Sequence, residues 1–225
     1  MRARSKVVAV LLVIVLSNWV AFPSGENDYP SGASTVTRNE VTSGTVSRPG
    51  DPVDWWKVYL PSPGKLVVFL DGEQAYDIDL YFYDNNLNLL GQSTGRGQDE
   101  IVYGSIQGGW YYIKVQAYFT SPVAVDYELG ALFVTRAAGY LTAGEVDFHS
   151  LYMAAGKTYW IFLLDERDHF DPDLYLAYGS DILAESEYTG DLDVIKWTPA
   201  RSSYYTIAVG GYAGSGYYYI LVGSR

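Results

Sequence analysis

The chain has 225 residues, of which 48% are hydrophobic and 16% aromatic, and it includes 22 Tyr, 23 Gly and 9 Pro. This length accommodates one large or two small domains, and the composition is typical of β-strands joined by tight turns rather than of disorder. The net charge of -11 disfavours nucleic acid as a partner, and the absence of Cys excludes disulfides, thiolate metal sites and a cysteine nucleophile.

The first 22 residues have the order of an export signal. Arg2, Arg4 and Lys6 precede an apolar run over residues 7–16, and a second apolar stretch follows at 19–22. The sequence therefore predicts a signal peptide or a retained membrane anchor at residues 1–22, with an extracellular or cell-surface location and membrane contact only through this segment. Residues 23–39 are rich in Ser, Gly, Thr, Asn and Pro, which is typical of a linker.

The remainder of the chain contains an internal repeat. The segment 76–82 is echoed by 170–176, so that Asp79 corresponds to Asp173, 94 residues further on. Segments 53–55, 64–65 and 110–115 are matched in the same way by 146–148, 156–157 and 204–209. Two long copies indicate tandem globular domains rather than a solenoid, and we expect them at residues 40–135 and 136–225.

Each copy consists of short β-branched or aromatic stretches, such as 57–60, 66–70, 79–83, 111–117 and 127–133, separated by Gly, Pro, Asn or Ser. This pattern predicts about eight strands in each copy, in an all-β sandwich or barrel. No segment after residue 23 has a long helical period.

Several motifs of the first copy resemble those of the bacterial and archaeal pre-peptidase C-terminal domain family. They are Gly50-Asp51-Pro52-Val53-Asp54-Trp55-Trp56, Gly64, Asp77-Ile78-Asp79-Leu80-Tyr81-Phe82, Gly108-Gly109-Trp110-Tyr111-Tyr112-Ile113-Lys114-Val115 and Tyr127-Glu128-Leu129. The second copy keeps the acidic loop at 144–148, Gly156, the segment 171–176 and Tyr217-Tyr218-Tyr219, but has Ser202-Ser203 in place of the glycine pair. It looks like a diverged member.

The resemblance implies two tandem jelly-roll-like antiparallel β-sandwich domains. Members of the family are typically appended to secreted proteases and other exported enzymes, where they assist secretion or bind insoluble substrates and surfaces. In this sequence a signal segment and a linker, and not a protease, precede the two modules, so we do not expect the role of a domain appended to a protease.

Some relatives hold calcium, and this implies a metal site at Asp51 and Asp54, with Glu26, Asp28 or Glu40 as linker donors. Calcium takes six to eight oxygen ligands, so an acidic loop offers the right chemistry. The corresponding residues in the second copy are Glu145 and Asp147, in a loop shortened by two residues. The alternative is that these acidic side chains cap turns through backbone N–H groups.

Two further sets of residues invite a functional interpretation. The pairs Asp77/Asp79 and Asp171/Asp173 each lie on one face of a strand, where they either hydrogen-bond neighbouring loops, bind a metal or form an acid/base couple. Aromatic side chains form a ligand surface or pack between the modules; the candidates for that surface are Trp55, Trp56, Trp110, Tyr217, Tyr218 and Tyr219.

We expect no enzymatic activity, no catalytic residues and no bound organic cofactor. His149 and His169 are the only imidazoles, and no nucleophile or phosphate-binding motif occurs. The sequence favours a noncatalytic exported binding or adhesion module that recognises surface polysaccharide or protein and is stabilised by calcium. The alternatives are a structural subunit of a surface layer or filament and an accessory partner of a separately encoded secreted protease. We expect the first copy to carry the ligand or calcium.

Overall fold

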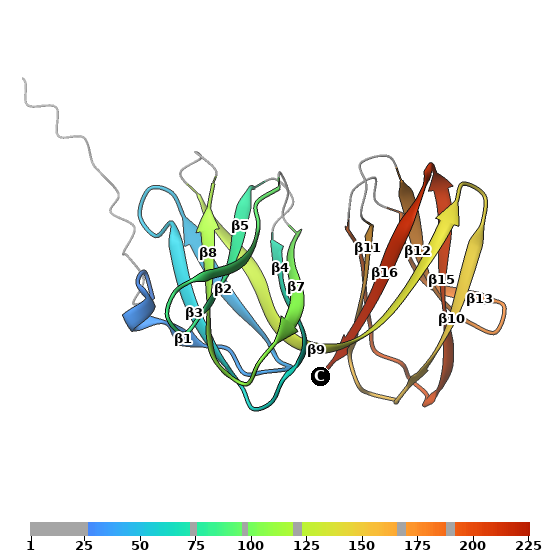
Figure 1. Cartoon of the computed structure of the whole chain (residues 1–225), viewed down its shortest axis with the longest axis horizontal. Coiled ribbons are helices and arrows are strands. Elements are labelled where there is room, and N and C mark those ends of the chain that lie inside the picture. The colour runs from blue at the N-terminus through green and yellow to red at the C-terminus, as the bar shows by residue number, and fades with distance from the viewer. Residues whose placement is uncertain (1–26, 73–75, 96–98, 119–122, 166–169, 188–191) are drawn as a thin grey trace, which may run out of the picture.

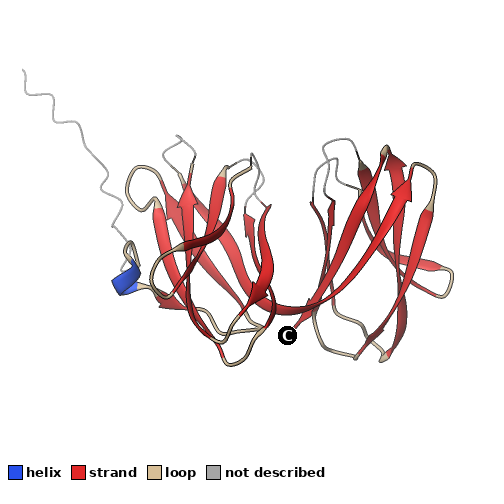
Figure 2. Cartoon of the chain, viewed as in Figure 1, coloured by secondary structure: helices blue, strands red, loops and turns tan. Residues whose placement is uncertain are grey.

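The computed structural model describes residues 27–72, 76–95, 99–118, 123–165, 170–187 and 192–225 (Figure 1). The predicted signal segment 1–22, Glu26 and His169 lie outside these residues. The described chain is almost entirely β-structure, and its single helical element is the three-residue 3-10 helix η1 (Pro30–Gly32) (Figure 2). Within the described ranges, no helix has the length and apolar character needed to cross a bilayer. The predicted all-β class is confirmed.

The N-terminal half is a sandwich of two sheets. One sheet has the order β1-β3-β8-β5-β6, and the opposing strands have the order β2-β9-β4-β7. The strands are β1 (Ser34–Thr35), β2 (Val41–Ser47), β3 (Val53–Leu60), β4 (Gly64–Gly72), β5 (Ile78–Asp84), β6 (Leu89–Ser93), β7 (Asp99–Ile106), β8 (Gly109–Ala117) and β9 (Ala124–Thr142). All pairings are antiparallel except the short parallel pair of β1 and β3.

The C-terminal half repeats this arrangement except for β1. The order β10-β15-β12-β13 matches β3-β8-β5-β6, and the order β9-β16-β11-β14 matches β2-β9-β4-β7. The strands are β10 (Val146–Met153), β11 (Tyr159–Asp165), β12 (Asp171–Tyr178), β13 (Asp181–Ser186), β14 (Leu192–Trp197), β15 (Ser203–Ala213) and β16 (Ser215–Ser224). The internal repeat of the sequence is therefore a repeat of topology.

Alternation along each strand builds the two cores. In β3, Asp54, Trp56, Val58 and Leu60 are buried, while the residues between them are more exposed. Such a period of two places one face of a strand between the sheets and the other towards solvent. The second core is formed in the same way, and its centre contains Leu174, Leu176, Ile207, Val209 and Tyr218.

The long strand β9 belongs to both halves and joins the two sandwiches, which lie side by side (Figure 1). Its first part pairs with β2 and β4, and residues from Val134 onwards pair with β16. One seven-stranded sheet thus runs through both halves. The predicted boundary between residues 135 and 136 lies inside this strand.

A third apolar cluster lies between the two sandwiches. It consists of Val67, Phe69, Leu132, Trp160, Phe162 and Leu221, and the rings of Phe69 and Phe162 are 5.3 Å apart. An ion pair between Lys196 and Glu128, with Nζ and Oε2 2.9 Å apart, joins the same two halves. Trp160 therefore packs between the modules.

Part of the predicted linker is folded onto the first sandwich. Ala33 and Val36 are buried, and the amide of Val36 donates to the carbonyl of Lys57 over 3.0 Å. Residues 27–39 carry too few apolar side chains to show a period, so their docking along β3 was not visible in the sequence.

Candidate functional site

A buried chain of hydrogen bonds surrounds Asp54, one of the predicted metal ligands. The Trp56 indole N–H donates to the Tyr127 hydroxyl over 2.8 Å, and that hydroxyl donates to Asp54 Oδ2. Asp54 and Trp56 lie on β3, while Tyr127 comes from β9 in the opposing sheet. Burial raises the pKa of Asp54 above its usual value, and the bond from Tyr127 opposes this shift. The chain therefore links the two sheets through groups that have little access to water.

The same chain occurs in the second half with one residue changed. The Tyr218 hydroxyl donates to Asp147 Oδ2 over 2.7 Å, and His149 Nε2 lies 2.8 Å from that hydroxyl, where Trp56 lies in the first half. Each tyrosine ring covers a glycine on the neighbouring strand, Gly44 for Tyr127 and Gly139 for Tyr218. Asp54 and Asp147 are thus repeated as parts of the fold.

Two more carboxylates, those of Asp28 and Asp51, act on the buried chain of hydrogen bonds around Asp54. The charge of Asp28 raises the pKa of Asp54, and Asp28 Oδ1 is buried without a hydrogen-bond partner. The charge of Asp51 contributes to the raised pKa of Tyr127. Asn27 fixes this approach because its carbonyl accepts the amide of Trp55 over 2.7 Å. The linker thus brings Asp28 to the predicted site.

The other predicted ligands are placed differently. Glu40 precedes β2, whose far end contacts Asp51, so roughly 20 Å of strand separates it from the site. In the second half, Glu145 Oε2 accepts the amide of Thr142 over 2.8 Å, which is the turn-capping role considered as the alternative. In the described part of the chain, no three His, Asp or Glu side chains form a ready-made metal cluster.

The Asp77/Asp79 pair is joined by a carboxylate that the sequence analysis missed. Asp79 is buried and accepts a hydrogen bond from the Tyr81 hydroxyl over 3.0 Å. Glu100 on β7 is also buried and accepts a hydrogen bond from the Ser93 hydroxyl; burial, followed by the charges of Asp79 and Asp77, raises its pKa to about 7. The second half repeats this bond between Ser186 and Asp193. The equal spacing of the two serine–acid pairs was the available sequence signal.

The predicted surface aromatics divide into buried and exposed residues. Trp56 and Tyr218 are only 8% and 0% exposed, so their assignment to a ligand surface is wrong. Both side chains point between the two sheets of their sandwich and belong to the hydrogen-bonded chains described above. Trp110 and Tyr217 are exposed, and each contacts the ring of a neighbouring tyrosine, at a tilt to Tyr59 and edge-on to Tyr140 respectively. A ligand at these two residues stays a prediction.

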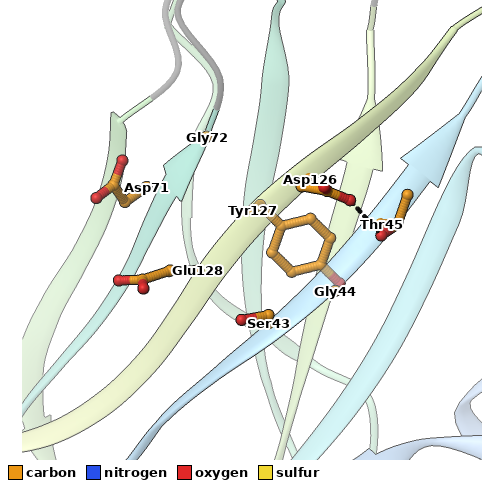
Figure 3. Close-up of a pocket in the computed structure, with 8 residues that line it drawn as sticks. All are labelled: Ser43, Gly44, Thr45, Asp71, Gly72, Asp126, Tyr127 and Glu128. Carbon is orange, nitrogen blue, oxygen red and sulfur yellow. Dashed lines mark hydrogen bonds between the residues drawn. The ribbon is translucent and has the colours of Figure 1, made fainter.

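An acidic hollow of about 400 Å³ lies over β2, β4 and β9 (Figure 3). Asp71 and Glu128 lie on one side of it, and Asp126 on the other accepts a hydrogen bond from the Thr45 hydroxyl over 2.6 Å. Glu128 already pairs with Lys196. Asp126 and Glu128 therefore already have partners within the protein, and we do not assign a ligand to this hollow.

A larger groove of about 470 Å³ lies on the outer face of the β10-β15-β12-β13 sheet, and we call it the C-terminal groove. Its walls carry the exposed side chains of Phe148, Ile182 and Tyr212, and Tyr175 lies between them. Its lining is completed by Gly144, Glu145, Val146, Asp173, Ala177, Gly179, Thr206, Ala208, Gly210 and Gly211. Because these residues are spread over four strands and two turns, no local motif revealed the groove.

Comparison with known proteins identifies one segment of the chain. The family model for the bacterial pre-peptidase C-terminal domain matches residues 52–117. These residues therefore carry such a domain, and the predicted resemblance is confirmed there. The membership of the second half stays a prediction, and no curated protein matches the chain.

Three solved structures are similar to this chain at low sequence identity. The pre-peptidase C-terminal domain of a collagenase from Bacillus anthracis is 18% identical over 44% of this chain and 93% of that chain, with a TM-score of 0.40. A putative secreted protein from Eubacterium rectale is 10% identical over 91% of this chain and 86% of its own, with a TM-score of 0.29. Tandem CBM51 modules of a family 98 glycoside hydrolase from Streptococcus pneumoniae are 9% identical over 81% and 83%, with a TM-score of 0.27.

Proposed function

We propose that this protein is a noncatalytic binding module that is exported to the cell surface or the medium and attaches to surface polysaccharide or protein. The C-terminal groove carries this proposal, because it exposes large aromatic and apolar side chains on a rigid sheet. Contiguous exposed apolar surface rimmed by polar groups marks interaction sites in soluble proteins. The export pattern of residues 1–22 supports the location.

The arrangement of titratable groups favours attachment over catalysis. In the described residues, Asp54, Asp147 and Asp79 each accept a hydrogen bond from a tyrosine hydroxyl. Asp173 lies 3.4 Å from the Tyr175 hydroxyl, in the position that corresponds to Asp79. His149 shares its bond with a tyrosine that already bonds an acid. Acids held in the same way in both halves are explained by the fold, which is repeated, rather than by a reaction centre.

Calcium is proposed as a stabilising ion at Asp28, Asp51 and Asp54. The support is electrostatic, since Asp28 brings a second negative charge to the buried Asp54 and leaves Oδ1 without a hydrogen bond. A divalent cation relieves repulsion between desolvated carboxylates, and calcium accepts the carbonyl and water ligands needed to complete its shell. The ion would tie residues 27–28 to the first sandwich.

Binding of the mature protein to isolated cell-wall polysaccharides, chitin and fibrous proteins tests the function, with and without a chelator. We expect retention on at least one of these materials, and retention on none of them overturns the proposal. Native mass spectrometry with and without calcium reports the number of bound metal ions. If the mass of the protein at a saturating calcium concentration includes no calcium ion, the calcium part of the proposal is wrong. Filaments or sheets in electron micrographs would instead favour the structural-subunit alternative.

A further inference from the structure

The outer face of the β10-β15-β12-β13 sheet has an unusual concentration of exposed apolar side chains. Val146, Phe148 and Tyr152 on β10 are between 49% and 71% exposed. Tyr204 and Tyr212 on β15 and Ile182 on β13 are between 61% and 73% exposed. No other face of the described chain gathers as many of its large exposed apolar residues.

The equivalent face of the first half is filled by its own side chains. Lys114 on β8 lies opposite Trp55 on one neighbouring strand and Tyr81 on the other. Its Nζ is 3.8 Å from the centre of the Tyr81 ring and donates to Gln116 Oε1 over 2.8 Å. Trp55 in turn contacts Tyr83, with ring centres 5.2 Å apart. The lysine stem and its neighbours therefore occupy the space between the aromatic rows.

The second half has the same strand register but carries small residues on its middle strand, β15. Ala208 on β15 lies opposite Phe148 on β10 and Tyr175 on β12, as Lys114 lies between its two aromatic neighbours. Thr206 and Gly210 stand at the positions of Tyr112 and Gln116. The C-terminal groove is thus the space that Lys114, Tyr112 and Gln116 fill in the first half. Strands two apart are about 10 Å from each other, which is wide enough for one extended chain.

The charge of the groove restricts what enters it. Glu145 and Asp173 line it, and Glu187 at its edge accepts the Tyr175 hydroxyl over 2.7 Å. The described lining residues include no Lys, Arg or His. Burial, followed by the charges of Glu187 and Asp171, raises the pKa of Asp173. Anionic polymers are repelled, and a second copy would place acids against acids.

We propose that the C-terminal groove binds an extended segment of a partner polypeptide that carries apolar side chains together with Lys or Arg. Apolar side chains occupy the space over Ala208 between Phe148 and Tyr175, and a cationic side chain pairs with Asp173 or Glu145. A neutral glycan would also stack on the aromatic walls, but it would leave the carboxylates without a counter-charge. This inference rests on the proposed binding function and chooses protein over polysaccharide as the ligand.

The test selects ligands from a random dodecapeptide phage library on the whole protein and measures the enriched peptides by calorimetry. The main variant is Ala208→Lys, which places in the groove the side chain that the first half tolerates at the same position. Phe148→Ala removes one wall at a 71% exposed residue, so its fold is not at risk. Leu90→Ala, at a 52% exposed residue of β6, is the matched control on the other half.

We expect peptides rich in Lys or Arg and apolar residues, whose affinity falls at least tenfold with Ala208→Lys or Phe148→Ala and is unchanged with Leu90→Ala. No enrichment, enrichment of acidic peptides, or equal affinity for all variants overturns the inference. Cellohexaose and chitohexaose are measured in parallel. If an oligosaccharide binds and loses affinity with Ala208→Lys, the peptide assignment is wrong while the proposed binding function stands.

Discussion

Replacing Tyr127 by Phe tests the buried chain that links the two sheets of the first half. The change removes one hydroxyl, and with it one of the side-chain donors to Asp54 and the acceptor of the Trp56 indole N–H. Asp54 is 3% and Trp56 8% exposed, so water does not readily replace either bond. A buried polar group left unsatisfied costs about 1–3 kcal/mol. Trp56 loses its partner, whereas Asp54 keeps a bond to the Asn27 side chain, so we expect a loss of about 2–3 kcal/mol in the free energy of unfolding.

Tyr218→Phe is the matched variant in the second half. Tyr218 bonds Asp147 and His149, which are both only partly buried, so water takes over part of each lost bond. We expect a smaller loss of about 1 kcal/mol. Urea denaturation followed by tryptophan fluorescence measures both variants. The reasoning is refuted if Tyr127→Phe costs less than about 1 kcal/mol or no more than Tyr218→Phe.

Three further changes probe packing and charge. Gly44→Ala places a Cβ 2.3 Å from the Tyr127 ring and should lower the free energy of unfolding, measured by urea denaturation, by about 1–3 kcal/mol. Gly104→Ala, which has open space around it, should lower it by less than about 0.5 kcal/mol. Equal losses in the two variants contradict this reasoning. Trp160→Ala removes the largest side chain from the cluster between the halves and should lower the free energy of unfolding by about 3–5 kcal/mol. It should also split calorimetric unfolding into two transitions. A single unchanged transition argues against coupling of the halves by this cluster. Glu100 has a pKa of about 7 in the folded protein, above its ordinary 4.5, so its contribution to stability is full below pH 4.5 and is lost as the pH rises through 7. Glu100→Gln should therefore stabilise the protein by about 2–3 kcal/mol at pH 8 and not at pH 4. Equal effects at the two pH values would refute this.

The fold was largely predictable because its signals are local and occur twice. The alternation in Ile113-Lys114-Val115-Gln116 marks a strand with one buried face, and the matching segments 76–82 and 170–176 mark a duplication. The all-β class, the tandem arrangement and the pre-peptidase C-terminal resemblance over residues 52–117 follow from such patterns. The seven-stranded sheet through β9 did not, because strand pairing between halves leaves no local mark.

The sequence by itself determined the all-β class and the alternation of residues along each strand, since strand period and turn residues are properties of neighbouring amino acids. Only the tertiary structure decided the partners of Asp54, the burial of Tyr218 and the docking of Asp28, because these contacts join segments far apart in the chain. It also placed the groove in the second half, although the first copy was expected to carry the ligand. Whether a sheet face is filled or hollow depends on which residues three adjacent strands bring opposite one another, as Ala208 lies between Phe148 and Tyr175.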